Sequence, residues 1–505
     1  MHLSLLDFFI IAASLGAIAV FGVLRSGKQN SVRDYFLSDS AIPWWSVCFA
    51  VVATETSALT FLSLPGVAYT TDITFLQLAI GYIIGRILVA RFFLPRYFEG
   101  TLETAYTYLE RRFGSHMRRT ASIAFLGTRF FADGVRLYAT AIPLALFLRG
   151  ANITAGLGST NTALIAIAVV ALLTTVYVYL GGVRAVIWTD VIQFFVYIIG
   201  AIAALTLVTS WTRESWSAIL STASSAGKFR VIAWGFDGGI GAFFTRPHTA
   251  VAGIIGGMFL SMASHGTDHL IIQRLLATNR LPNAQRALVG SGIVVFIQFA
   301  LFLILGAMLW IFYQGSPQPS NEVFSRFILE NIPSGLRGFI IAGVLAAAMS
   351  TLSGSISALS SSTILDIVGP LMAKKRKDGT SLRQSRAVSV LWSIVLIASA
   401  ALFIGTPTAV VELALGIASY TYGALLGVYL LGVFFRGARE RSAMIGFATS
   451  LLGTAVIILT TDLAWTWYIP VGTTLCIASA TVAEHGSRES TGVPSIRKDE
   501  VHGNH

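Results

Sequence analysis

The chain has 505 residues, of which 55% are hydrophobic and 12% are charged, whereas soluble proteins average about 25% charged residues. So few charges cannot cover a water-exposed globule of this size, which excludes an ordinary soluble protein and predicts a membrane protein. The net charge of +11 comes from basic residues in short segments between apolar runs, so we expect no nucleic-acid partner.

About thirteen apolar runs are long enough to cross a bilayer, since a spanning helix needs about 20 apolar residues. They lie near residues 4–24, 44–73, 76–98, 120–149, 159–180, 185–210, 247–272, 284–314, 335–366, 387–404, 408–435, 440–460 and 464–484. We therefore predict an all-α polytopic membrane protein, with one transmembrane transporter domain over residues 1–484 and a disordered cytoplasmic tail over residues 485–505.

Two further segments are too polar to cross the membrane. Residues 101–116 indicate an amphipathic helix at the membrane interface. Residues 211–246 carry several charges and predict a loop with a short surface helix.

Basic residues concentrate in alternate loops, from Arg25, Lys28 and Arg33 in the first loop, through residues 374–377, to Arg436 near the end. Cytoplasmic loops of membrane proteins are enriched in Lys and Arg. An odd number of spans then places the N-terminus outside and the C-terminus in the cytoplasm. We expect a multi-pass protein of a plasma membrane, that of a bacterium, embedded in the lipid bilayer without an obligate protein partner.

Polar residues interrupt two of the apolar runs. The second run carries Thr54, Glu55, Thr56 and Ser57 at its middle, where an ionised side chain costs about 2.5–3.5 kcal/mol unless it is paired or hydrated. The seventh run is crowded with polar residues around Gly266. Irregular backbone at membrane depth must line a cavity or bind a ligand, and transporters place such breaks in corresponding positions of two inverted halves. The two runs are five spans apart, as two five-helix halves require.

The ninth run carries the hydroxyls of Ser350, Thr351 and Ser353 on a helix of small residues. A hard cation prefers oxygen ligands, which backbone carbonyls of a broken helix and neighbouring hydroxyls can supply. The alternative is that these small residues only allow close helix packing.

Charged residues also occur inside other runs. Arg129, Asp133 and Arg136 share one face of the fourth run, and they either hold Glu55 or a substrate carboxylate or form a closed ion-pair ladder. Arg86 in the third run is expected to pair or to extend toward the membrane surface.

The seventh run carries two histidines, His265 and His269, at the spacing of a metal site. No other strong ligand cluster is near them in the sequence, so we expect no transition metal. Asp268 is expected to cap a helix or to pair inside the bundle.

Several motifs in a consistent order point to one family. The most specific is YLGGVRAVIWTDVIQ at residues 179–193, supported by residues 34–37, 64–66, 266–268, 273–274 and 347–351. Over nearly the whole chain, to about residue 460, the sequence resembles the sodium:solute symporter family, which includes sodium–glucose, proline, iodide and bacterial sialic acid transporters. The resemblance implies a LeuT-type five-plus-five inverted repeat, with halves near residues 44–210 and 247–435 and with broken second and seventh helices.

The resemblance also implies a sodium site. Backbone oxygens of the broken second span would come from Ala53 and Thr56. The ninth span would add a backbone oxygen of Ala347 and the hydroxyls of Ser350 and Thr351.

Asp190 and Ser353 match positions that hold a second sodium, or line its exit route, in some relatives. Gly354 stands where those relatives carry another serine.

The substrate contacts of sialic acid symporters map onto Glu55, Ser57, Thr60 and Phe75, and Arg136 is a further candidate. Glu55 replaces a neutral hydroxyl residue there, so the identity of the substrate is not transferred.

We therefore expect sodium-coupled symport of a small organic solute, such as a sugar, a sialic acid-like compound or a carboxylate, into the cell by alternating access. Sodium is the coupling ion, and no enzymatic activity is implied. One alternative is a proton-coupled transporter in which Glu55 or Asp190 titrates. Another is a solute sensor, although the short tail offers no signalling domain.

Overall fold

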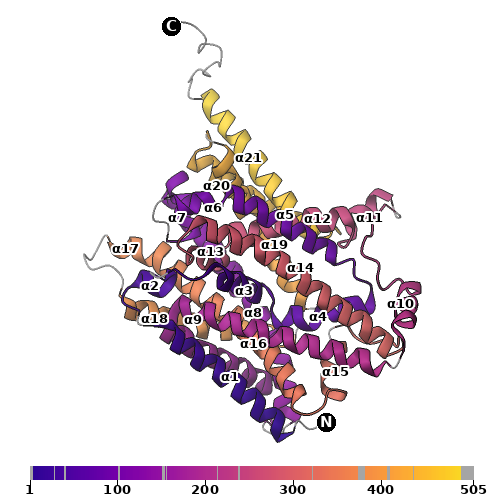
Figure 1. The fold of residues 1–505 in the computed structure, drawn as a ribbon. Helices are drawn as coiled ribbons and strands as arrows, with labels where there is room; N and C mark the ends of the chain where they lie inside the picture. The colour runs from indigo at the N-terminus through magenta and orange to yellow at the C-terminus, as the bar shows by residue number, and fades with distance from the viewer. Residues whose placement is uncertain are drawn as a thin grey trace.

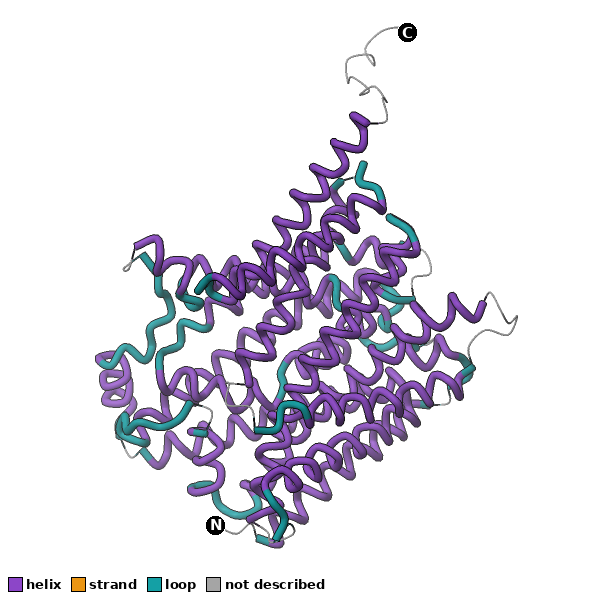
Figure 2. The backbone as a smooth tube through the Cα atoms, turned by 180° about the vertical axis from the view of Figure 1, so that it is seen from behind, coloured by secondary structure: helices purple, strands orange, loops and turns teal. Residues whose placement is uncertain are grey.

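The structure is a computed structural model that describes residues 4–27, 29–38, 41–99, 103–150, 154, 156–212, 214–236, 239–320, 322–373, 381–405, 410–435 and 437–490. All regular elements in these ranges are helices, as Figure 2 shows from one side, which confirms the all-α prediction. The predicted basic residues Lys28, Arg436 and 374–377, and the tail from residue 491, lie outside the described residues.

Eight helical stretches in the described part of the chain are long and apolar enough to cross a membrane. They are Leu5–Ser26 (α1), Ser159–Trp211 (α9), Gly241–Gly266 (ending with α12), Leu281–Phe312 (α14), Leu336–Leu371 (beginning with α16), Leu382–Ala401 (α18), Gly416–Phe434 (within α19) and Glu440–Thr460 (α20). A bent pair of helices, α3 (Trp44–Glu55) and α4 (Ala58–Thr70), makes a ninth span if it is counted as one. These stretches are those of a multi-pass membrane protein.

The remaining helices complete the chain. Their bounds, with those of the helices named above only in part, are α2 (Val32–Leu37), α5 (Leu76–Phe92), α6 (Leu94–Phe98), α7 (Ala105–Arg112), α8 (Ser115–Gly150), α10 (Trp216–Ser225), α11 (Gly239–Thr245), α12 (Ala250–Gly266), α13 (His269–Leu276), α15 (Val323–Glu330), α16 (Leu336–Ser362), η1 (Thr363–Val368), α17 (Gly369–Ala373), α19 (Val410–Phe434), η2 (Trp465–Trp467) and α21 (Tyr468–Ser490). The predicted interfacial helix corresponds to α7, and the polar segment 211–246 carries α10 and α11. Helix α21 continues to Ser490, past the predicted start of the tail at residue 485, which corrects that boundary.

The long helices run roughly side by side, and the short helices collect at two opposite edges of the bundle. Figure 1 shows α2, α7 and α17 along the left edge and α10, α11 and α15 along the right edge. These are the segments that the charge pattern assigns to opposite sides of the bilayer.

Glycines allow the closest helix contacts, because without a side chain two backbones can approach each other. A Cβ atom at Gly81 of α5 would lie 2.3 Å from the carbonyl oxygen of Ile254, and one at Gly257 of α12 would lie 2.4 Å from that of Leu78. In lipid, where burial of apolar surface gives little advantage, such van der Waals contact holds α5 against α12.

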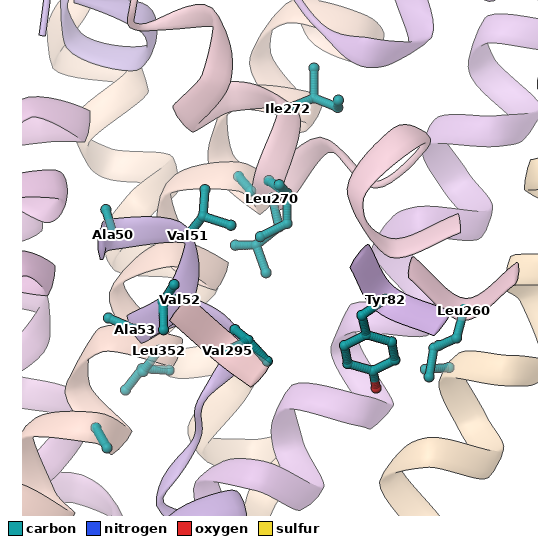
Figure 3. Close-up of a cluster of buried hydrophobic side chains, with 14 of the residues drawn as sticks. Ala50, Val51, Val52, Ala53, Tyr82, Leu260, Leu270, Ile272, Val295 and Leu352 are labelled. Atoms are coloured by element: carbon teal, nitrogen blue, oxygen red, sulfur yellow. The ribbon is translucent and has the colours of Figure 1, made fainter. Parts of the chain in front are cut away.

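The interior around the broken span is apolar and tightly filled. Figure 3 shows part of this cluster, with Ala53 of α3, Leu352 of α16 and Leu270 of α13 among its buried side chains. The outer surface is apolar as well: Leu459 is 84% exposed and Leu172 is 66% exposed. An apolar exterior of this kind suits contact with lipid.

Candidate functional site

The second apolar run is broken in the structure. Helix α3 ends at Glu55 and α4 begins at Ala58, and the chain bends there by 62°. The amide of Ser57 donates to the carbonyl of Glu55 (3.1 Å), so the carbonyl of Ala53 loses the amide that a continuous helix would offer it. Ser57 also caps α4, since its hydroxyl accepts from the amide of Thr60 (3.4 Å). The interruption thus lies among the polar residues that predicted it.

The hydroxyls of α16 face this break. Thr351 Oγ1 lies 3.4 Å from the carbonyl oxygen of Thr54 and 3.3 Å from that of Ala347. The hydroxyl of Ser350 donates to Asp190 Oδ1 (2.7 Å). All five residues are buried. The structure therefore brings oxygen atoms of the second and ninth predicted spans into one place.

Thr56 completes the predicted set of sodium ligands and is buried with Ala53. Its hydroxyl accepts from Gln298 Nε2 (2.5 Å), and Gln298 Oε1 accepts in turn from the hydroxyl of Tyr197 (3.2 Å). This leaves the backbone carbonyl of Thr56 as its predicted ligand atom. A set of neutral hydroxyl and carbonyl oxygens suits a hard monovalent cation.

Asp190 lies next to this set and is itself paired. Arg274 donates to Asp190 Oδ2 through Nη2 (2.9 Å) and Nε (3.2 Å), and both side chains are buried. The hydroxyl of Ser353 donates to the carbonyl of Ser350 on its own helix (2.9 Å).

A cavity of about 430 Å³ adjoins the break. All five candidate substrate residues line it, namely Glu55, Ser57, Thr60, Phe75 and Arg136. Other polar or aromatic lining residues are Ser63, Tyr82, Arg129, His248, Ser264, His265, Phe299, Tyr422 and Trp465. Thr54 lines the cavity too, so the cavity and the group of oxygen atoms share a wall.

Glu55 is paired with Arg86 of α5, and His265 Nε2 lies 3.6 Å from the same carboxylate oxygen. Arg86 is fully buried and also donates to the hydroxyl of Ser291 (2.6 Å). The pairing predicted for Arg86 therefore has Glu55 as its partner, whereas Arg129 and Arg136 bind other carboxylates.

Arg129, Asp133 and Arg136 form an ion-pair ladder along α8. Asp133 Oδ1 accepts from Arg129 (3.2 Å) and from Arg136 (3.5 Å). Arg129 also pairs with Asp268, which accepts a second bond from the hydroxyl of Tyr422 (2.7 Å). The ladder thus has its further partner in Asp268, while the side chain of Arg136 remains 23% exposed.

The seventh predicted span is broken at Thr267 and Asp268, between α12 and α13. Asp268 caps α13 by accepting from the amide of Leu270 (2.9 Å), so it both caps and pairs, as predicted. The two histidines have different neighbours: His265 Nδ1 lies 2.8 Å from the hydroxyl of Ser264, and His269 Nε2 lies 3.0 Å from that of Ser361. The described residues contain no group of three or more His, Cys, Asp or Glu side chains placed to hold a metal ion.

Sequence reasoning missed Gln298, Tyr422 and His248. Gln298 stands alone in an apolar stretch, and the criterion that identified Glu55 applies to it equally. Tyr422 and His248 carry no comparable signal, because aromatic residues are common in apolar helices and at their ends.

Comparison with known proteins adds to this geometry. The profile of the sodium:solute symporter family matches residues 35–450. The chain is 28% identical to the sodium/sialic acid symporter NanT of Aliivibrio fischeri, with 94% of this chain and 91% of the relative covered. It is 25% identical to the sodium/glucose cotransporter of Vibrio parahaemolyticus, with 89% and 84% covered.

Solved structures show the same relationship. A substrate-bound, outward-open Na⁺-coupled sialic acid symporter superposes with a TM-score of 0.82 at 25% identity, covering 95% of this chain and 98% of the other. MHP1, a nucleobase-cation-symport-1 family transporter, superposes with a TM-score of 0.57 at 13% identity, covering 90% and 95%, and shares the fold alone.

Proposed function

The chain belongs to the sodium:solute symporter family, and from this premise we propose how its residues couple sodium to the movement of a solute. The protein is a multi-pass membrane transporter, not an enzyme, and it carries a small organic solute together with sodium. The observation that carries the proposal is the contact between α16 and the break in the second span, where Thr351 Oγ1 lies 3.4 Å from Thr54 O.

The proposed sodium ligands are the backbone oxygens of Ala53, Thr56 and Ala347 and the hydroxyls of Ser350 and Thr351. Their support is the loss of the helical partner of Ala53 at the break and the burial of the whole set. Because these ligands are neutral, the ion brings the charge. A single charge that crosses 100 mV is worth about 2.3 kcal/mol, which gives the inward gradient a means to drive the cycle.

In the proposed cycle, sodium enters from outside and draws the broken second span toward α16, around the cavity. Alternating access then follows from the rocking of one helix bundle against the other. Thr54 belongs to both the cavity wall and the contact with Thr351, which supports direct communication between the ion and the solute.

The proposed architecture has thirteen spans with a five-plus-five inverted repeat over residues 44–210 and 247–435. The breaks in the second and seventh runs support it. Helix α9 supports it too: its 53 residues would extend about 80 Å at 1.5 Å per residue, against a hydrocarbon core of about 30 Å. It therefore accounts for two crossings. We place the N-terminus outside and the C-terminus, with its tail, in the cytoplasm of a bacterial cell.

The proposed solute contacts are Glu55, Ser57, Thr60, Phe75 and Arg136, which share one cavity. Hydroxyl groups of the protein suit a polyhydroxylated solute, and the partly exposed guanidinium of Arg136 suits a carboxylate. A sugar, a sialic acid-like compound or a simple carboxylate therefore remains within the proposed class, in keeping with the relatives that carry sialic acid or glucose.

The test is thermal unfolding of the purified protein in sodium or choline at fixed pH. Sodium at about 100 times its Kd should stabilise the wild type by about 2.7 kcal/mol. Under sodium, a panel of sialic acid, glucose and pyruvate then identifies the solute. Stabilisation that follows pH instead of sodium would favour a proton-coupled transporter.

A double variant tests the ion site. Ser350→Ala with Thr351→Ala should abolish the sodium-dependent stabilisation while the protein still inserts. Ser360→Ala is the matched control, because this buried serine lies on the same helix and donates to the carbonyl of Ile356. A sodium response that survives in the double variant removes the ion-site assignment.

A further inference from the structure

A buried ion pair lies directly beside the proposed sodium site. Asp190 belongs to α9 and Arg274 to α13, the short helix after the second break. The two carboxylate oxygens of Asp190 have different partners: Oδ2 accepts from Arg274, and Oδ1 accepts from the hydroxyl of Ser350 (2.7 Å). One of the proposed sodium ligands is thus bonded to the carboxylate that holds Arg274.

The guanidinium of Arg274 fits over a glycine. A Cβ atom at Gly354 would lie 2.4 Å from Nη2 and 3.0 Å from Nη1 of Arg274. Even a serine at this position would displace the guanidinium. Nη1 is further fixed by the carbonyl of Leu270 (2.9 Å). The side chain of Arg274 is therefore held on three sides, by Asp190, Gly354 and Leu270.

A carboxylate buried without a counter-charge is strongly unfavourable, so it either gains a proton or attracts a cation. Next to a site that concentrates sodium, the available cation would be a second sodium ion. Arg274 supplies the positive charge instead, and a guanidinium keeps its charge at any pH the protein meets.

We propose that Arg274 is a tethered cation that takes the place of a second sodium ion at Asp190, so that the protein binds one sodium ion. The inference rests on the proposed sodium site and assigns its stoichiometry. Ser353 agrees with it, since its hydroxyl is bonded back to Ser350 O and faces away from Asp190 as a donor. Asp190 then acts as a positioning residue: it takes the hydroxyl proton of Ser350, so that the oxygen lone pairs of Ser350 are free for the ion.

Equilibrium binding of ²²Na⁺ to the purified full-length protein tests the stoichiometry. The wild type should bind one ion per molecule. Arg274→Ala removes the tethered charge and opens the space above Gly354, so this variant should bind two. The charge-matched control, Asp190→Asn with Arg274→Ala, removes both members of the pair and should bind one ion again.

Two ions on the wild type overturn the proposal, as does a single ion on a folded Arg274→Ala protein, because a purely structural arginine would leave the count unchanged. If Arg274→Ala does not fold, the wild-type count decides alone. The result is separable from the proposed function: a wild type that binds no sodium contradicts the symport site, whereas a wild type that binds two contradicts only the role of Arg274.

Discussion

At the scale of single residues, the charges inside the bundle occur as pairs between different helices. Glu55 pairs with Arg86, and Asp190 pairs with Arg274. Removing an ion from water costs several kcal/mol, and a close partner of opposite charge offsets much of that cost. Each pair joins a helix next to a break to a helix elsewhere in the bundle, so these residues also fix how the broken segments sit.

The pair of Glu55 and Arg86 gives a prediction for stability. Arg86→Met leaves Glu55 without its partner and should lower the free energy of unfolding by about 3–5 kcal/mol. Adding Glu55→Gln should recover much of the loss, because the unpaired charge is then gone. Denaturant unfolding in detergent measures both changes.

The control for this prediction is an exposed ion pair, Arg326 with Glu330 on α15. Arg326→Ala should cost at most about 0.2–1 kcal/mol, because solvent screens such pairs. Equal losses for Arg86→Met and Arg326→Ala would show that burial adds nothing to the first pair.

The sequence identified Glu55 and Asp190, because a charged residue in an apolar run stands out by its cost alone. It could not identify their partners. Arg86 and Arg274 are 31 and 84 residues away from them, and which side chains meet depends on how each helix is rotated and packed. The carboxylate partners of Arg129 show the same limit, since Asp133 lies four residues away on its own helix and was expected, whereas Asp268 lies 139 residues away.

At the scale of elements, the two breaks were predictable because their causes are local. Polar residues from Thr54 to Ser57 and around Gly266 weaken the helix where they stand, and the structure ends α3 and α12 there. The bend of α9 has a different cause. Gly182 has φ 55° and ψ −155°, a region open essentially to glycine alone, and it lies against the backbone of Tyr35. The gap between the predicted runs 159–180 and 185–210 located this turn but not its conformation.

Gly182→Ala should therefore destabilise the protein. The backbone conformation alone costs about 1–3 kcal/mol for a residue with a side chain, and the new Cβ would lie 2.3 Å from the carbonyl oxygen of Tyr35. Gly127→Ala in α8 is the control, since a Cβ there meets no atom within 4 Å. It should be neutral or stabilising by about 0.4–1 kcal/mol. Comparable melting temperatures for the two variants would contradict this account of the turn.

At the scale of the whole molecule, the polar interior explains why hydropathy alone finds fewer spans than the length of the chain allows. Helices α5 and α8 are not among the eight most apolar stretches, and they carry Arg86, Arg129, Asp133 and Arg136. These side chains line or support the cavity, so the helices that build the site have the weakest apolar signal. Recognition of motifs outside those helices supplied what hydropathy could not.

Cysteine labelling tests the proposed orientation. The native Cys48 and Cys476 are buried, so the background should be low. Ser217 on α10 and Arg383 on α18 are exposed and lie in segments assigned to opposite sides of the membrane. Ser217→Cys should react with a membrane-impermeant maleimide in intact cells, and Arg383→Cys only after the cells are opened. The reverse pattern would invert the orientation and leave the fold unchanged.

The loop between α10 and α11 reaches the broken span through one side chain. Lys228 donates to the carbonyls of Tyr69 (2.7 Å) and Thr71 (2.8 Å) at the end of α4, and its ammonium lies 5.0 Å from the centre of the Trp310 ring. Burial lowers the pKa of this ammonium from its ordinary value, and nearby Asp72 opposes that shift. The loop and the outer half of the broken span are thus one mechanical unit. A stroke of α4 either drags the loop with it or strips a cation from two carbonyls, so this exposed stretch of chain must register each turnover of the carrier.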